Sequence, residues 1–291
     1  MIPRFSLAHP STLPEAFAAH AAADGDAAYL AGGTELLQVM KMGFAQFRLL
    51  IDLKGIAELR GLEVAPEGRL RIGAATTHRE LERSPQVREM LPALAALETK
   101  VANVRVRNTG TIGGNLAFAE PHSDPATFFL ACGATVELAG PNGRRELTIG
   151  DFALGPLFTA REPEEVLVAI HVPGAAPSSG RAYSKIAFFE RPAASVGLAL
   201  TVTNGVIADA TVAVGSLTEV PTIVAAAGAA FGGTEAVAEA LDEPVRVAAE
   251  SFSELDIVAD LNGSADYKRH LAGVLLGRAA QSALREALAR A

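Results

Sequence analysis

The amino-acid sequence predicts an α+β fold of two domains, and three observations support this prediction. The chain has 291 residues, more than a single compact core usually holds. Helix and strand patterns alternate through residues 1–174, whereas residues 181–291 carry three successive strand patterns followed by helices. Between them, residues 173–180 are rich in proline, glycine and serine, which is typical of a linker. We therefore expect one domain over residues 1–174 and a smaller one over 181–291.

The first 55 residues predict a compact α/β unit, the first of two subdomains in the larger domain. Apolar patterns and glycine stops predict alternating helices and strands, with helices over 14–23 and 35–42 and strands over 27–31 and 48–53. A sharp turn at Gly32-Gly33 joins the first strand to the second helix. We expect Thr34 to cap this second helix and Gly43 to end it.

Residues 56–174 predict the second subdomain, in which strands flank a run of helices. We expect paired strands at 62–64 and 70–74, a helix capped by Thr77 and running to Arg83, a helix at 92–102, a glycine-rich loop at 110–114, an apolar segment at 127–138, and a strand with alternating apolar faces at 166–172. The smaller domain predicts antiparallel strands at 182–188, 196–203 and 207–214 and a closing helix at 264–290.

Composition excludes several classes of protein. Hydrophobic residues make up 49% of the chain and charged residues 20%, which is the composition of a globular protein rather than a disordered one. The net charge of −8, without any cluster of Lys and Arg, argues against binding to nucleic acid. Cys132 is the only cysteine, so this chain cannot supply the four thiolates of an iron–sulfur cluster. It lies in an apolar run and is expected to be a buried small residue.

The sequence shows no pattern of a signal peptide or a membrane span, and we expect a cytoplasmic protein. The N-terminus lacks the basic and then apolar pattern of a signal peptide. No uninterrupted apolar run approaches the roughly 20 residues that cross a bilayer. We expect a soluble chain with no membrane span and no metal site of its own.

The segment from Tyr29 to Leu36 has the arrangement of an anion site. A strand, the Gly32-Gly33 turn and a helix start follow one another, and glycines let the backbone N–H groups approach a phosphate closely. The segment matches neither the G-x-G-x-x-G fingerprint nor a P-loop. From these residues alone, a tight strand-to-helix turn is an equally good interpretation.

A second glycine segment runs from Arg105 to Asn115 and includes Gly110, Gly113 and Gly114. Its hydroxyl, amide and backbone groups suit a pyrophosphate or the polar edge of a ring cofactor. The alternative is a glycine-rich surface loop. Two such segments in one domain favour a cofactor site over a simple strand-to-helix turn or a glycine-rich surface loop.

The segment Glu120–Pro125 is harder to interpret. Asp124 could accept hydrogen bonds from a ribose, but the residues alone favour a role as cap of the helix that Pro125 opens. His122 is more often a surface histidine than a catalyst. The sequence assigns no role to Glu120 or His122.

Several of these motifs resemble the FAD-binding medium subunits of the molybdenum hydroxylases, the family of xanthine dehydrogenase and aerobic carbon monoxide dehydrogenase. The resemblance runs along nearly the whole chain. It is carried by Ala31-Gly32-Gly33-Thr34-Glu35, Arg107-Asn108, Thr111-Ile112-Gly113-Gly114-Asn115 and the spacing to Asp124, and later by Tyr183-Ser184-Lys185 with Arg191 and by Ser264–Arg269 with Leu275 and Arg278.

The resemblance implies a two-subdomain FAD-binding domain of the PCMH type, with subdomains of about 1–55 and 56–174. A smaller C-terminal domain with a three-stranded antiparallel sheet and helices would follow over 181–291. The implied cofactor contacts are Tyr29, Leu30, Ala31, Gly32, Gly33, Thr34, Glu35, Leu36, Val101, Arg107, Thr111, Ile112, Gly113, Gly114, Asn115, Asp124, Val166 and Lys185. For Lys185 the alternative is a solvated lysine on a strand. No side chain is expected to act as a catalyst, because the isoalloxazine of FAD does the chemistry.

The function implied by the resemblance is electron transfer. A large subunit would carry molybdopterin and a small subunit two [2Fe-2S] centres, from which electrons reach FAD in this chain and leave to NAD or another acceptor. The complex would be a heterotrimer, with or without further dimerisation. One alternative is a stand-alone FAD-dependent oxidase or dehydrogenase of a small molecule, which the short, polar-poor segment 181–291 disfavours. The other is a flavin-free scaffold subunit, which the two intact glycine segments disfavour.

Overall fold

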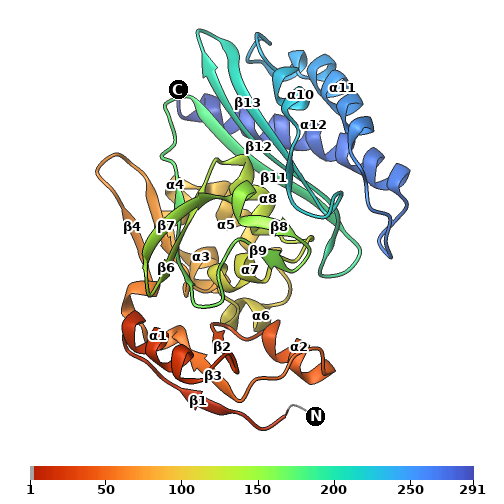
Figure 1. Ribbon diagram of the computed structural model, residues 1–291. Helices are drawn as coiled ribbons and strands as arrows, with labels where there is room; N and C mark the ends of the chain where they lie inside the picture. The colour runs from red at the N-terminus through yellow and green to blue at the C-terminus, as the bar shows by residue number, and fades with distance from the viewer. Residues whose placement is uncertain (1–2) are drawn as a thin grey trace.

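Three packed units follow one another along the chain in the computed structural model, which describes residues 3–291 (Figure 1). The N-terminal unit lies at one end of the molecule, the C-terminal unit at the other, and the middle unit between them. Each unit has its own sheet. No helix in residues 3–291 is both long enough and apolar enough to span a membrane.

The N-terminal unit is a three-stranded parallel sheet with strand order β1-β3-β2. Its elements are β1 (Ser6–Ala8), α1 (Leu13–Ala22), β2 (Ala27–Leu30), α2 (Leu36–Met42), β3 (Leu49–Asp52) and the short 3-10 turns η1 (Leu53–Gly55) and η2 (Ala57–Leu59). The predicted helices and strands are confirmed, and β1 is an addition that the sequence pattern did not indicate. Gly43 ends α2 in the left-handed conformation, as expected. The expectation that Thr34 caps α2 was wrong, because Glu35 occupies the N-cap and no side chain there accepts a hydrogen bond.

The middle unit is built on a five-stranded antiparallel sheet with strand order β4-β5-β10-β6-β7. These strands are β4 (Leu62–Val64), β5 (Leu70–Gly73), β6 (Thr135–Gly140), β7 (Gly143–Thr148) and β10 (Val166–Val172). The central strand β10 is buried on both faces, and an irregularity in its pairing with β6 at Leu167–Ala169 interrupts the expected alternation. Leu167 and Ile170 join one apolar cluster, while Val166 and Val168 join the cluster that packs against the N-terminal unit.

Helices connect the strands of the middle unit. They are α3 (His78–Arg83), α4 (Pro85–Met90), α5 (Pro92–Glu98), α6 (Val104–Thr109), α7 (Ile112–Phe118), α8 (Asp124–Ala131) and α9 (Ile149–Phe152), with a small hairpin of β8 (Ala153–Gly155) and β9 (Phe158–Thr159). Thr77 and Glu80 form a capping box at α3, which confirms the predicted cap. The helix expected to run to residue 102 ends at Glu98. The stretch expected as a glycine loop is helical from Ile112 onward.

The C-terminal unit contains the three long antiparallel strands that the sequence predicted, with a two-residue strand added at one edge. They are β11 (Ser179–Ala187), β12 (Pro192–Thr203), β13 (Val206–Gly215) and β14 (Thr222–Ile223), followed by α10 (Ala225–Ala229), η3 (Ala238–Ala240), α11 (Asp242–Glu250), η4 (Ser251–Glu254) and α12 (Ala265–Ala289). Helix α12 packs on β11 and β12. Their approach requires Gly180, where a Cβ would lie 1.8 Å from the Ala283 carbonyl oxygen.

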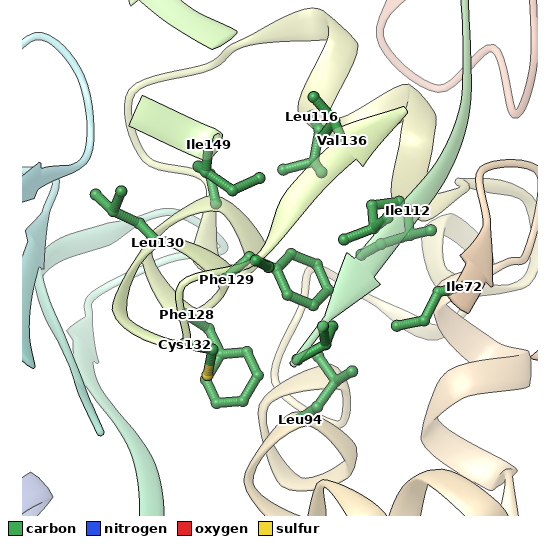
Figure 2. Packing of buried hydrophobic residues seen from close by; sticks show 14 of the residues in the cluster. Ile72, Leu94, Ile112, Leu116, Phe128, Phe129, Leu130, Cys132, Val136 and Ile149 are labelled. Carbon is green, nitrogen blue, oxygen red and sulfur yellow. The ribbon is translucent and has the colours of Figure 1, made fainter. Parts of the chain in front are cut away.

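The middle and C-terminal units meet at helix α8. Strand β12 crosses this helix so closely that a Cβ on Gly197 would lie 2.9 Å from the Thr127 carbonyl oxygen. On its other side α8 inserts Phe128 and Phe129 into the main core, where both are fully buried, and the Phe129 ring lies amid the labelled side chains of Figure 2. Cys132 is buried in the same cluster, as predicted, and burial raises the pKa of its thiol to about 12. This helix therefore fixes the position of the residues that precede it.

Candidate cofactor site

A cavity of about 680 Å³ lies between the N-terminal and middle units. This volume is in the range of about 300–1,000 Å³ that is usual for small-molecule and cofactor sites. Its walls come from the end of β2, the two glycine segments, the turn before α8, and residues 157–167. The cavity therefore gathers segments that are far apart in the sequence, including both segments in which the sequence predicted a cofactor site.

The first glycine segment presents unpaired backbone donors to this cavity. Gly33 has a φ of +71°, a left-handed conformation that glycine adopts without strain. The N–H groups of Gly32, Gly33 and Thr34 donate to no protein acceptor within residues 3–291. Consecutive free N–H groups of this kind form a concave site for an anion. These N–H groups are available to an anion, as the first interpretation of this segment requires, and they lie in the tight turn from β2 into α2 that the second interpretation describes.

The second glycine segment uses its backbone donors internally. The N–H groups of Ile112 and Gly113 donate to the carbonyl oxygens of Thr76 and Ala74, at 2.9 Å each. The Gly114 N–H donates to Thr111 Oγ1 at 3.1 Å. These glycines allow close packing, since a Cβ at Gly113 would lie 2.4 Å from the Ala74 Cβ.

The two glycine segments pack directly against each other. A Cβ on Gly32 would lie 2.4 Å from the Thr109 carbonyl oxygen and 2.6 Å from the Gly110 Cα. The second segment thus supports the first from behind. The polar groups it can still offer a ligand are side chains such as Asn115, whose Oδ1 accepts a hydrogen bond from Ser123 Oγ at 2.5 Å while its amide nitrogen has no acceptor among the described residues.

Most of the residues predicted to contact the cofactor line the cavity. They are Tyr29, Ala31, Gly32, Gly33, Thr34, Glu35, Leu36, Val101, Thr111, Gly113, Gly114, Asn115, Asp124 and Val166. Four others do not belong to its lining. Leu30 and Ile112 point into the apolar core. Arg107 and Lys185 make ion pairs behind the wall.

Arg107 holds the turn that follows α5. Its Nε pairs with Glu82 Oε2 at 3.0 Å, and its Nη1 donates to the carbonyl oxygens of Val101 (3.0 Å) and Ala102 (3.1 Å). Ala102 has a φ of +41°, a conformation that a non-glycine residue adopts only when its surroundings fix it. Arg107 therefore fixes the turn that places Val101 in the cavity wall.

Lys185 and Asp124 form a buried ion pair across the interface of the middle and C-terminal units. Lys185 Nζ lies 2.5 Å from Asp124 Oδ2 and also donates to the Lys100 carbonyl oxygen at 2.9 Å. The Tyr183 hydroxyl donates to the other carboxylate oxygen. The two charged side chains are only 8% and 5% exposed, so the alternative of a solvated lysine was wrong. Burial raises the pKa of the Asp124 carboxyl, and the Lys185 ammonium opposes this rise.

Ser123, and not Asp124, caps helix α8. The Ser123 hydroxyl accepts a hydrogen bond from the Ala126 N–H at 3.2 Å. The capping interpretation of Asp124 was therefore wrong by one residue. Asp124 instead occupies the first turn of the helix, where it both borders the cavity and pairs with Lys185.

The sequence patterns did not indicate several residues of the cavity wall, and the charged Arg161 is one of them. Its Nη1 donates to the carbonyl oxygens of Glu162, Pro163 and Glu165 at 2.8, 3.1 and 2.7 Å. Burial lowers the pKa of this guanidinium. Nearby, the Tyr29 hydroxyl donates to the Glu164 carbonyl oxygen at 3.1 Å, and burial raises its pKa to about 12. Arg161 lies in a polar turn without any motif, so no sequence pattern indicated it.

A chain of alternating charges joins all three units, and four of its six members line the cavity. Its members, in order, are Lys268, Asp260, His122, Glu120, Arg191 and Glu35, with successive separations of 2.7, 3.0, 2.9, 3.3 and 3.8 Å. His122 is its centre, with Nδ1 on Glu120 and Nε2 on Asp260. The structure thus gives Glu120 and His122 a role in joining the units.

The chain of charges sets the protonation of its members. The hydrogen bond to Glu120 is the largest cause that raises the pKa of His122 above 6.5. Burial acts to raise the pKa of Asp260, but the hydrogen bond from Lys268 and its other donors outweigh this and lower it to about 2. The two carboxylates beside His122 therefore favour its protonated form.

Replacing His122 with glutamine is expected to lower the free energy of unfolding by about 1.5 kcal/mol at pH 6, since hydrogen bonds between charged groups are lost. Because the folded protein raises the pKa of His122, this contribution is complete below pH 6.5 and disappears as pH rises through the folded-state pKa. Urea unfolding at pH 6 and pH 9 measures the loss of stability and its disappearance at high pH.

The matched control is His9→Gln, which changes an exposed histidine 3.6 Å from Asp52. It should alter stability by less than about 0.5 kcal/mol at either pH. A deficit of the His122 variant that is equal at both pH values would contradict the protonated chain.

The cavity fits a dinucleotide cofactor. Its free N–H groups at Gly32–Thr34 suit a pyrophosphate, and the small residues Ala31, Gly113 and Gly114 leave room beside them. Apolar side chains such as Val101 and Val166 provide a surface for a ring. With the two-unit architecture around the cavity, this arrangement defines a flavin-binding protein of the two-subdomain type, followed by a separate C-terminal domain.

Comparison with known proteins makes the family explicit. Residues 3–175 match the family described as the FAD binding domain in molybdopterin dehydrogenase, and residues 185–283 match the CO dehydrogenase flavoprotein C-terminal domain. The chain belongs to this family of FAD-binding medium subunits of molybdenum hydroxylases. It is therefore a flavoprotein component of an oxidoreductase, with FAD as its cofactor.

Relatives of known identity match nearly the full length of the chain. It is 36% identical over 284 residues to the carbon monoxide dehydrogenase medium chain of Hydrogenophaga pseudoflava, with 97% of each chain covered. A structure of carbon monoxide dehydrogenase from that organism, which lacks the Mo-pyranopterin moiety, superposes with a TM-score of 0.92, 35% identity and coverage of 98% and 99%. Quinoline 2-oxidoreductase from Pseudomonas putida 86 gives a TM-score of 0.91 at 28% identity, with 99% of each chain covered.

Proposed function

We propose that this chain transfers electrons, through its FAD, from [2Fe-2S] centres of a partner subunit to NAD or another acceptor. The observation that carries the proposal is the cavity between the first two units, with unpaired N–H groups at one wall and apolar side chains at another. The full-length similarity to the medium chain of carbon monoxide dehydrogenase supports it. The FAD-binding domain would span residues 1–174, with subdomains of about 1–55 and 56–174, and the C-terminal domain residues 181–291.

The residues present suggest how FAD would be held. The N–H groups of Gly32, Gly33 and Thr34 would bind the pyrophosphate, and Asn115 would offer its side-chain amide. Arg107, Lys185, Leu30 and Ile112 would act indirectly, by fixing the wall from behind. Bound FAD supplies the ability to exchange electrons singly or in pairs, and the protein orients it and excludes water.

The proposed partners follow from what this chain lacks. Its single cysteine is buried in the core of the middle unit, so iron–sulfur centres would be carried by another chain. We propose a large subunit with molybdopterin and a small subunit with [2Fe-2S] centres, forming a heterotrimer, with or without further dimerisation, in the cytoplasm. The substrate of the complex would be selected by the large subunit.

The purified chain is expected to be yellow and to release FAD on denaturation. The visible absorption spectrum and chromatography of the released cofactor measure this. Protein that is colourless and takes up no added FAD would contradict the site and favour the flavin-free scaffold. Protein that contains FAD and oxidises small molecules with oxygen, without partners, would favour the stand-alone oxidase instead.

The electron-transfer role needs the assembled complex. After reduction by dithionite, the [2Fe-2S] centres of the complex are expected to be reoxidised by the acceptor rapidly when FAD is present and slowly after FAD has been removed. Equal rates with and without FAD would mean that electrons leave by another route, even if the chain binds FAD.

A further inference from the structure

A buried histidine–glutamate pair lies at the cavity wall, and neither residue is among the cofactor contacts that the sequence predicted. His78 is the first residue of α3 and Glu98 the last of α5. Their side chains are 3% and 0% exposed, and His78 Nδ1 lies 2.8 Å from Glu98 Oε2. The other carboxylate oxygen, Glu98 Oε1, is buried without a hydrogen-bond partner among residues 3–291. Such a polar pair is costly to bury and therefore calls for an explanation.

The His78 ring lies at the junction of the two glycine segments. The His78 N–H donates to the Gly110 carbonyl oxygen at 3.1 Å, and the side chain borders the cavity. A Cβ on Gly110 would meet His78 Cδ2 at 3.3 Å and Thr34 Oγ1 at 3.4 Å. Since Nε2 is bonded to Cδ2, this nitrogen lies close to the part of the cavity where the first segment presents its free N–H groups.

The pairing with Glu98 determines what Nε2 can do. His78 Nδ1 and Glu98 Oε2 share one hydrogen bond of 2.8 Å, which occupies that side of the ring. The carboxylate thereby fixes the orientation of the ring, as the partner of a histidine does in many sites. Nε2 has no hydrogen-bond partner among the described residues, so it is free for a ligand. An N–H at Nε2 can donate to an anionic ligand while Nδ1 stays on Glu98.

We propose that His78 donates a hydrogen bond from Nε2 to the pyrophosphate of FAD, and that Glu98 is the positioning residue that orients it. This inference rests on the proposed placement of the pyrophosphate at Gly32–Thr34. The two arginines that line the cavity are engaged elsewhere, Arg161 with backbone carbonyl oxygens and Arg191 with Glu120 and Glu35. The histidine therefore completes an anion site made otherwise of neutral backbone donors.

The test uses two substitutions, each of which places an amide nitrogen near the position of one ring nitrogen. His78→Asn keeps a donor near the position of Nδ1, toward Glu98, but has nothing at Nε2. His78→Gln reaches the position of Nε2. The affinity of the apoprotein for FAD and for ADP, a probe that carries the pyrophosphate without the flavin, is measured by calorimetry. Phosphorus NMR of the FAD-loaded chain reports directly on the pyrophosphate.

His78→Asn is expected to lower the affinity for FAD and the affinity for ADP by about tenfold each, which corresponds to the loss of one hydrogen bond to a charged group. It should also move the phosphorus signals, whereas His78→Gln should restore part of the affinity. Glu98→Gln should lower the affinity for both ligands less than His78→Asn does, because the side-chain amide oxygen of glutamine can still accept a hydrogen bond from the ring and orient it.

Unchanged phosphorus signals and unchanged affinity in His78→Asn would overturn the inference. So would an equal loss in both His78 variants, since that would mean that the ring only packs. Melting temperatures of the apoproteins separate a loss of folding from a loss of contact. Failure of the unsubstituted chain to bind FAD would instead refute the proposed function.

Discussion

Replacing Lys185 with methionine is expected to lower the free energy of unfolding by about 3–5 kcal/mol, because it leaves the buried Asp124 carboxylate without its cation. The two side chains are 8% and 5% exposed and 2.5 Å apart. The Tyr183 hydroxyl alone cannot balance a full charge. Urea unfolding of the apoprotein at neutral pH measures the loss.

The deficit of the Lys185 variant should shrink as pH falls. Without Lys185, burial raises the pKa of Asp124 further, so the folded protein binds a proton that the unfolded chain lacks, and stability rises on acidification. The double variant Lys185→Met with Asp124→Asn should be more stable than Lys185→Met alone, since both charges are then gone.

Lys54→Met is the matched control for Lys185→Met. Lys54 pairs with Asp52 at 3.4 Å, but its side chain is 47% exposed. Pairs of this kind contribute about 0–1 kcal/mol. A loss at Lys185 no larger than that at Lys54 would show that the ion pair across the interface is not what holds the C-terminal unit to α8.

The local patterns of the sequence predicted most of the regular structure because the signals are local. The capping box at Thr77 lies within four residues of its partner, and Gly43 ends α2 through its own backbone conformation. The strand β1 escaped prediction because it has only three residues, of which Ser6 and Leu7 are exposed. It is ordered by pairing in parallel with β3, more than forty residues later.

The candidate site was predicted as a set of segments but not as a set of contacts. Glycine motifs mark where a backbone must approach something closely, but they do not say what it approaches. Gly32 approaches Gly110, and Gly113 approaches Ala74, so both pack protein against protein. The partners of Arg107 and Lys185 are 25 and 61 residues away, and only the fold brings them together. The same is true of His78 and Glu98.

Replacing Gly32 with alanine is expected to weaken FAD binding by about a hundredfold. The added Cβ would lie 2.4 Å from the Thr109 carbonyl oxygen and 2.6 Å from the Gly110 Cα. Both atoms belong to the backbone, so the clash cannot be relieved by turning a side chain. The two glycine segments must separate, at a cost of about 1–3 kcal/mol. Since the N–H groups proposed to bind the pyrophosphate lie in one of these segments, most of this cost should appear as lost affinity.

Fluorescence titration of the apoprotein with FAD measures this loss, and the melting temperature of the apoprotein shows how much of the cost falls on folding. The matched control is Gly277→Ala in helix α12, where a Cβ would make an ordinary contact of 3.6 Å with Val245. Alanine should stabilise that helix slightly and leave FAD affinity unchanged. If Gly32→Ala bound FAD as tightly as the unsubstituted chain, the close contact between the two segments would not be needed to shape the site, and the cofactor would have to be held mainly by other parts of the cavity wall.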